Sequence, residues 1–116
     1  IAAFGALSIY AAANDAVQAP SVTYTNQIAR LVQNKCQECH RPEGVAPFEL
    51  MTYRQVKGWA SMIREVVDDG RMPPWHADPA HGVFRNDRRL TDQEKADLFA
   101  WLDGGMIEGD PAALPA

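Results

Sequence analysis

Apolar residues recur every three or four positions in three separate parts of the chain, and each part is predicted to form a helix. In the first part, Ile28, Leu31 and Val32 have the i, i+3, i+4 spacing that places apolar side chains on one helix face. We expect this helix to begin near Thr25 and to run directly into Cys36.

A second helix is predicted over residues 53–69. Thr52 and Gln55 have the spacing of a capping box, in which two side chains satisfy the free N–H groups of a helix start. Gly70 suits the left-handed position that ends many helices. The apolar positions at helical spacing are Val56, Trp59, Ile63, Val66 and Val67.

The third helix begins at another capping box, Thr91 with Glu94, and ends at Gly104-Gly105. Its apolar face would contain Leu98, Trp101 and Leu102. No segment shows the alternating pattern of a β-strand, so the fold class is predicted to be all-α. We expect Trp59, Met62 and Trp101 to lie in the core.

The predicted helices leave one long connection, residues 71–90, in which three prolines exclude a helix. A loop of this length inside a compact domain usually has a function. We divide the chain into an apolar N-terminal segment and linker (1–20), one domain (21–110) and a loose tail (111–116).

The N-terminal segment allows three interpretations. Residues 1–13 have only Ser8 and Tyr10 as polar residues, and Val17-Gln18-Ala19 resembles a signal-peptidase site. The segment is therefore the remnant of an export signal, the outer end of a membrane anchor, or a helix packed on a neighbouring domain or subunit. Alone it is too short to cross a bilayer, which takes about 20 residues.

Composition narrows the classes of partner. With 116 residues, 47% hydrophobic and 22% charged, the chain has a globular composition. The net charge is −4, and Asp87 interrupts the only arginine cluster, Arg85, Arg88 and Arg89, so a nucleic-acid partner is not expected. An acidic protein favours partners that have a positive face.

The two cysteines form a chemical motif, because a disulfide scaffold would need more of them. Cys36-Gln37-Glu38-Cys39-His40 is a C-x-x-C-H sequence, the spacing of covalent haem attachment. Two thiols on one turn can add to the two vinyl groups of a haem. His40 would then lie beside the iron as its proximal ligand.

Two other kinds of site remain as alternatives. A thioredoxin-like dithiol normally lies in a βαβ unit, which the pattern does not predict. A zinc site could combine Cys36, Cys39 and His40 with His76 or His81 as the fourth ligand, although this spacing differs from paired zinc knuckles.

With these motifs, the chain from about Thr23 to Gly109 resembles a class I c-type cytochrome with one haem. The resemblance implies three main helices wrapped around one covalently bound haem, with the last helix crossing the first. It also implies a loop proline, here Pro47, whose carbonyl accepts a hydrogen bond from the proximal histidine. The segment Arg71-Met72-Pro73-Pro74-Trp75 resembles the loop that supplies the distal methionine.

A narrower resemblance covers Met72-Pro73-Pro74-Trp75-His76-Ala77-Asp78 and Asn86-Asp87-Arg88-Arg89-Leu90. Both runs are similar to small cytochrome modules in multidomain bacterial proteins, where they are joined to thioredoxin-like or copper-monooxygenase domains. The chain is then expected to be a fragment or a subunit of a larger protein.

Met72 is our expected sixth ligand, with His76 and His81 as rivals. A thioether ligand raises the reduction potential of haem iron. Arg71 is expected to pair with a haem propionate, and Trp75 to cover the haem edge or donate its N–H to a propionate. Phe48 and Tyr53 are candidates for the pocket lining.

The expected function is single-electron transfer, as a carrier or as a relay subunit of a larger redox complex. No nucleophile–base pattern and no phosphate loop indicates an enzyme. One alternative is a haem module with an open distal site, and another is a structural or assembly subunit of a membrane redox complex. The family's biology implies redox partner proteins and a periplasmic or outward-facing location, with membrane contact through residues 1–13.

Overall fold

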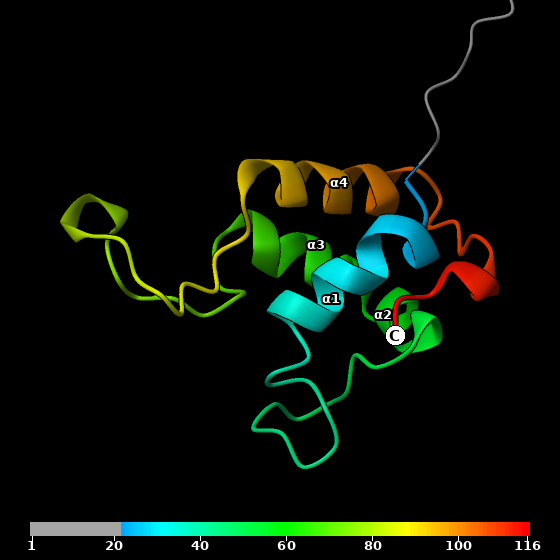
Figure 1. Ribbon diagram of the computed structural model, residues 1–116, viewed down its shortest axis with the longest axis horizontal. Helices are drawn as coiled ribbons and strands as arrows, with labels where there is room; N and C mark the ends of the chain where they lie inside the picture. The colour runs from blue at the N-terminus through cyan, green and yellow to red at the C-terminus, as the bar shows by residue number, and fades with distance from the viewer. Residues whose placement is uncertain (1–21) are drawn as a thin grey trace, which may run out of the picture.

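A computed structural model describes residues 22–116, and the interpretations of the N-terminal segment lie outside them. The described chain is helical and contains no strand, which agrees with the all-α prediction. Figure 1 shows four labelled helices gathered into one body, with a long loop projecting from it.

The first predicted helix is present and has two parts. A π-helical turn, η1 (Tyr24–Ile28), leads into α1 (Ala29–Lys35). The Thr23 side chain caps the start by accepting a hydrogen bond from the Asn26 N–H at 3.2 Å. The cysteine motif therefore begins at the C-terminal end of this helix.

The second predicted helix is interrupted at Trp59, so the prediction of one continuous helix over 53–69 was wrong. The segment forms α2 (Tyr53–Gly58) and α3 (Ala60–Asp68). The Trp59 N–H is shared between the Gln55 and Val56 carbonyls, at 3.3 and 3.2 Å, which tightens the turn there. The capping box at Thr52 is confirmed. Gly70 has the expected left-handed conformation, with φ +81°.

The last helix, α4 (Asp92–Asp103), begins at the predicted capping box and ends at Gly104. Trp101 is confirmed as a core residue, since only 1% of it is exposed. Its indole N–H donates to the Ile107 carbonyl at 2.9 Å, and the Tyr53 hydroxyl donates to the Met106 carbonyl at 2.8 Å. The buried apolar core contains Tyr24, Ile28, Ala29, Leu31, Val32, Leu50, Val56, Leu98 and Trp101.

The start of the first helix is joined to the segment that follows α4. The Tyr24 N–H donates to the Ile107 carbonyl, and the Thr25 N–H donates to the Glu108 carbonyl, both at 2.9 Å. Gly109 has φ +85°, and a side chain there would overlap the Thr25 hydroxyl. These contacts join the start of the first helix to the segment after α4, and Figure 1 shows this helix beside α4.

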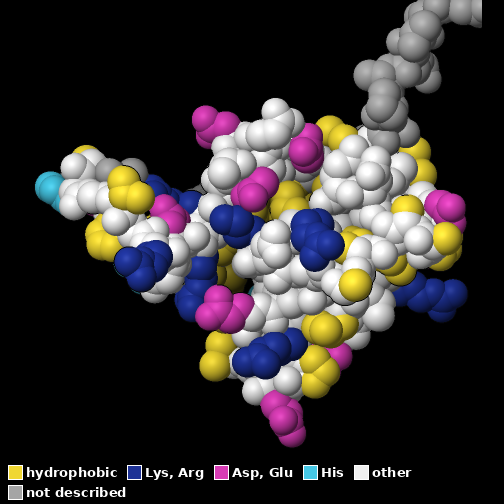
Figure 2. Space-filling model, in the orientation of Figure 1, with side chains coloured by type: hydrophobic (Ala, Val, Ile, Leu, Met, Phe, Trp, Pro, Cys, Tyr) yellow, Lys and Arg dark blue, Asp and Glu magenta, His cyan; other side chains and the backbone are white. Residues whose placement is uncertain are grey.

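The long connection is irregular, as predicted, apart from the short turn η2 (Pro79–His81). Residues 73–87, which we call the arm, project from the body (Figure 1), and Figure 2 shows basic and apolar side chains next to one another on it. The C-terminal tail contains a turn, η3 (Pro111–Ala113), capped by Asp110. Within residues 22–116, no helix has the length and apolar character needed to cross a membrane.

Candidate functional site

A cavity of about 520 Å³ lies between α1, the loop that follows it, α2, α3 and the base of the arm. This volume falls in the range of ligand-binding cavities, roughly 300–1,000 Å³. Most of the lining is apolar. It consists of Leu31, Val32, Lys35, Cys36, Glu38, Cys39, His40, Val45, Ala46, Pro47, Phe48, Leu50, Val56, Trp59, Met62, Ile63, Val66, Val67, Met72, Pro73, Pro74, Arg88, Leu90 and Leu98.

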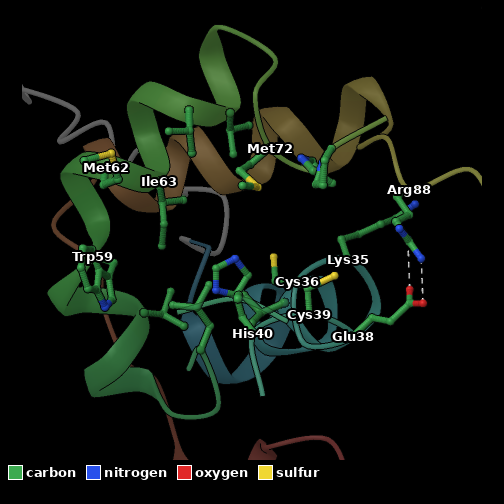
Figure 3. Close-up of a pocket in the computed structure, with 18 of the residues that line it drawn as sticks. Lys35, Cys36, Glu38, Cys39, His40, Trp59, Met62, Ile63, Met72 and Arg88 are labelled. Atoms are coloured by element: carbon green, nitrogen blue, oxygen red, sulfur yellow. Dashed lines mark hydrogen bonds and ion pairs between the residues drawn. The ribbon is translucent and has the colours of Figure 1, made fainter. Parts of the chain in front are cut away.

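The structure brings Cys36, Cys39 and His40 to one wall of this cavity (Figure 3). The backbone turns there because the Cys39 and His40 N–H groups both donate to the Cys36 carbonyl, at 3.2 and 2.9 Å. Gly44 packs so closely on the Cys39 carbonyl that a side chain at position 44 would overlap it. Burial raises the pKa of the Cys36 thiol to about 12, so this thiol stays protonated at neutral pH.

The His40 ring is fixed by one hydrogen bond, because its Nδ1 lies 3.0 Å from the Phe48 carbonyl oxygen. A carbonyl only accepts, so Nδ1 carries a hydrogen, and in the neutral ring Nε2 keeps the lone pair that a metal needs. The resemblance assigns this carbonyl to Pro47, whereas in the structure the carbonyl is that of Phe48 and Pro47 lines the cavity. The Leu50 N–H donates to the His40 carbonyl, and this register places Phe48 opposite the ring.

Met72 lines the cavity across from the cysteine motif, as Figure 3 shows. Its N–H donates to the Val66 carbonyl at 2.9 Å, which holds the start of the loop against α3. The cavity therefore has an imidazole on one side and a thioether on the other. His76 and His81, the rival ligands, lie on the arm and do not line it.

Two residues assigned to the core line the cavity instead. Met62 is 45% exposed and Trp59 is 39% exposed. Both were assigned to the core because they lie near the apolar face of the predicted helix, but that helix breaks at Trp59. The Trp59 ring stacks on Phe48 with 4.0 Å between ring centroids. Phe48 lines the cavity as expected, whereas Tyr53 packs against Tyr24 in the core.

Arg71 and Trp75 do not lie at the cavity, so the roles predicted for them at a haem edge are not supported. Arg71 forms ion pairs with Glu65 and Asp69 at 2.6 and 2.7 Å, and these two carboxylates keep its guanidinium away from the cavity. Trp75 lies on the arm, where its ring packs edge-on against the Phe84 ring. Its Nε1 is buried and has no hydrogen-bond partner among the described residues.

Sequence reasoning missed two cations that line the cavity, Lys35 and Arg88. The Lys35 Nζ donates to the Arg89 carbonyl at 3.0 Å and lies 3.7 Å from Glu94. Arg88 forms two hydrogen bonds with Glu38. Lys35 directly precedes Cys36, and this is the one sequence signal that could have placed a cation at the cavity. The position of Arg88 depends on the path of the arm.

His76 and His81, the fourth ligands of the zinc alternative, do not line the cavity with Cys36, Cys39 and His40. Among residues 22–116, no three His, Cys, Asp or Glu side chains gather in a way that could hold a metal ion. The remaining donor set, an imidazole nitrogen and a thioether sulfur in an apolar cavity with two thiols, fits a haem iron.

No protein-family model, curated protein or solved structure is detectably similar to this chain.

Proposed function

We propose that this chain is a monohaem c-type cytochrome that transfers single electrons. The observation that carries the proposal is the position of Cys36, Cys39 and His40. All three face one apolar cavity, and the His40 Nε2 is free to bind a metal. A zinc or dithiol site would not need an apolar cavity of this size beside it.

In this proposal Cys36 and Cys39 would hold the porphyrin through thioether links, and His40 and Met72 would hold its iron. When bound, the haem supplies an iron that gains or loses one electron. The Phe48 carbonyl keeps the hydrogen of His40 on Nδ1. Because the lining is mostly apolar, few polar groups would reorganise around the haem when the charge of its iron changes.

We propose redox proteins as the partners and a location outside the cytoplasm, because haem attachment requires exported haem and reduced thiols. The chain would act as a carrier or as a relay subunit of a larger complex. The cavity offers a binding site for a redox group, and the protein contributes its ligands and its surroundings.

The test is to express the full chain with and without a c-type maturation system and to measure its mass and visible spectrum. We expect a mass increase of one haem, a Soret band, and retention of colour in denaturant. Cys36→Ser and Cys39→Ser should each lose one thioether link. His40→Ala should lose the six-coordinate spectrum. His76→Ala, on the arm, is the matched control and should keep it. A correctly matured sample without colour would contradict the proposal.

The open distal site stays a second candidate, because Met72 lies at the start of the long irregular connection and a small ligand could displace it. Rapid binding of carbon monoxide to the reduced protein would favour this function. Slow or absent binding would favour electron transfer, with His40 and Met72 both holding the iron.

A further inference from the structure

Three aromatic rings lie in a row along one side of the cavity. The His40 and Phe48 rings are 4.6 Å apart between centroids, and the Phe48 and Trp59 rings are 4.0 Å apart and nearly parallel, at 18°. Phe48 therefore touches His40 in two ways, through its ring and through its carbonyl oxygen.

The backbone around Phe48 leaves its ring to be fixed by side-chain packing. Ala46 and Leu50, on either side of it, donate their N–H groups to the Cys39 and His40 carbonyls. These two bonds fix the path of the loop but not the direction of the Phe48 side chain. The stack on Trp59 supplies that direction.

Trp59 is placed for this contact by the break between α2 and α3. Its backbone has φ −100° and ψ 11°, outside the helical conformation of its neighbours. The indole remains 39% exposed, whereas Trp101 is fully buried in the core. Trp59 therefore packs beside the cavity and not in the core.

We propose that Trp59 is a positioning residue for His40 that acts through Phe48. By holding the Phe48 ring against the His40 imidazole, it sets the orientation of the His40 ring towards the Phe48 carbonyl and keeps the Nδ1 hydrogen bond closed. This inference rests on the proposed function where it treats His40 as a ligand of the iron. The hydrogen bond itself can be measured in any folded sample.

The test measures the exchange of the His40 Nδ1 hydrogen with solvent in the full chain, by NMR of its ¹⁵N-labelled ring. We expect Trp59→Ala to speed this exchange by about two- to tenfold, the range set by the strength of an aromatic pair. Trp59→Phe keeps a stacking ring and should restore slow exchange. Trp75→Ala removes an indole on the arm and should leave the rate unchanged.

A second measurement uses coloured samples of the same variants. In the oxidised protein, rotation of the axial imidazole changes the electron paramagnetic resonance spectrum. The spectrum should therefore change in Trp59→Ala and stay near the wild type in Trp59→Phe.

Wild-type exchange and spectra in a folded Trp59→Ala protein would overturn the inference. If Trp59→Ala does not fold, Phe48→Leu provides the same test, because it keeps the carbonyl and removes the stack. If the protein never acquires colour but Trp59→Ala still speeds the exchange, the positioning role of Trp59 is supported and the haem is rejected. A coloured protein in which Trp59→Ala changes neither the exchange rate nor the spectrum would support the haem and reject the positioning role of Trp59.

Discussion

The Arg88 guanidinium donates two hydrogen bonds to the Glu38 carboxylate, from Nε at 3.1 Å and from Nη2 at 2.8 Å, across fifty positions of sequence. Glu38 lies between the two cysteines of the motif, and Arg88 lies at the base of the arm (Figure 3). The Lys35 ammonium donates a hydrogen bond to the carbonyl of Arg89, the residue after Arg88. The base of the arm is therefore fastened to the segment that carries the cysteines.

Glu38→Gln should loosen the base of the arm. The substitution removes the charge on one side of the ion pair, so proteolytic cleavage near Arg88 and Arg89 should become faster. Both partners are partly exposed, and the effect on overall stability should be small and should shrink in high salt. Limited proteolysis and a urea titration measure the two effects. Glu43→Gln, an equal charge change in the same loop region, is the control and should cleave as the wild type does.

Stability should fall in acid through the pair formed by Asp87 and Arg89. The Arg89 side chain donates hydrogen bonds to the Asp87 carboxylate and lowers its pKa to about 2. The carboxyl of an unfolded chain titrates near pH 4, roughly 3.9. A lowered pKa means that the stabilising contribution is complete above about pH 4 and is lost as the pH falls towards 2.

Asp87→Asn should therefore lower stability at neutral pH and flatten the fall between about pH 4 and 2. Denaturant midpoints at a series of pH values provide the measurement. Asp97→Asn removes a carboxylate that accepts from the uncharged Gln93 amide and serves as the control. An unchanged acid profile in Asp87→Asn would show that the pair makes no contribution.

Met72→Ala should remove the weak near-infrared band of a methionine-ligated iron and lower the reduction potential markedly, because a thioether ligand raises it. Met51→Ala alters an exposed side chain outside the cavity and should preserve both. Met62 also lines the cavity, so Met62→Ala completes the comparison. Loss of the band in Met62→Ala, with retention in Met72→Ala, would transfer the ligand role to Met62.

Gly109→Ala should destabilise the fold by more than about 1 kcal/mol, because Ala is strained at positive φ and its side chain would also overlap two threonines. Gly105 is a matched control, since it too has a positive φ, +95°, but faces open space. The difference between Gly109→Ala and Gly105→Ala in denaturant titrations isolates the steric part. Equal losses would mean that the segment after α4 can move away from Thr25.

Local sequence signals predicted the starts of the helices well. Thr52 with Gln55 and Thr91 with Glu94 form complete capping boxes, because each pairing needs only residues within one turn. The cysteine motif was equally local, so its place after the first helix was predictable. Gly70 ended its helix for the same reason.

The errors arose where distant contacts decide the outcome. The break at Trp59 coincides with its stack on Phe48, which the helical pattern does not contain. Assigning the carbonyl to Phe48 rather than Pro47 required the bond from Leu50 to His40. Arg71 differs, because the carboxylate that binds its guanidinium belongs to Asp69, only two positions away in the sequence.

The two hydrogen bonds that Tyr24 and Thr25 donate to the segment after α4 connect the two ends of the described chain. Both residues are almost completely buried, so a local fluctuation of one helix does not expose these amides to water. Their hydrogens should exchange only when the first and last helices separate, which is close to unfolding of the whole domain. The slowest amide signals of this protein should therefore report its global stability without any added label.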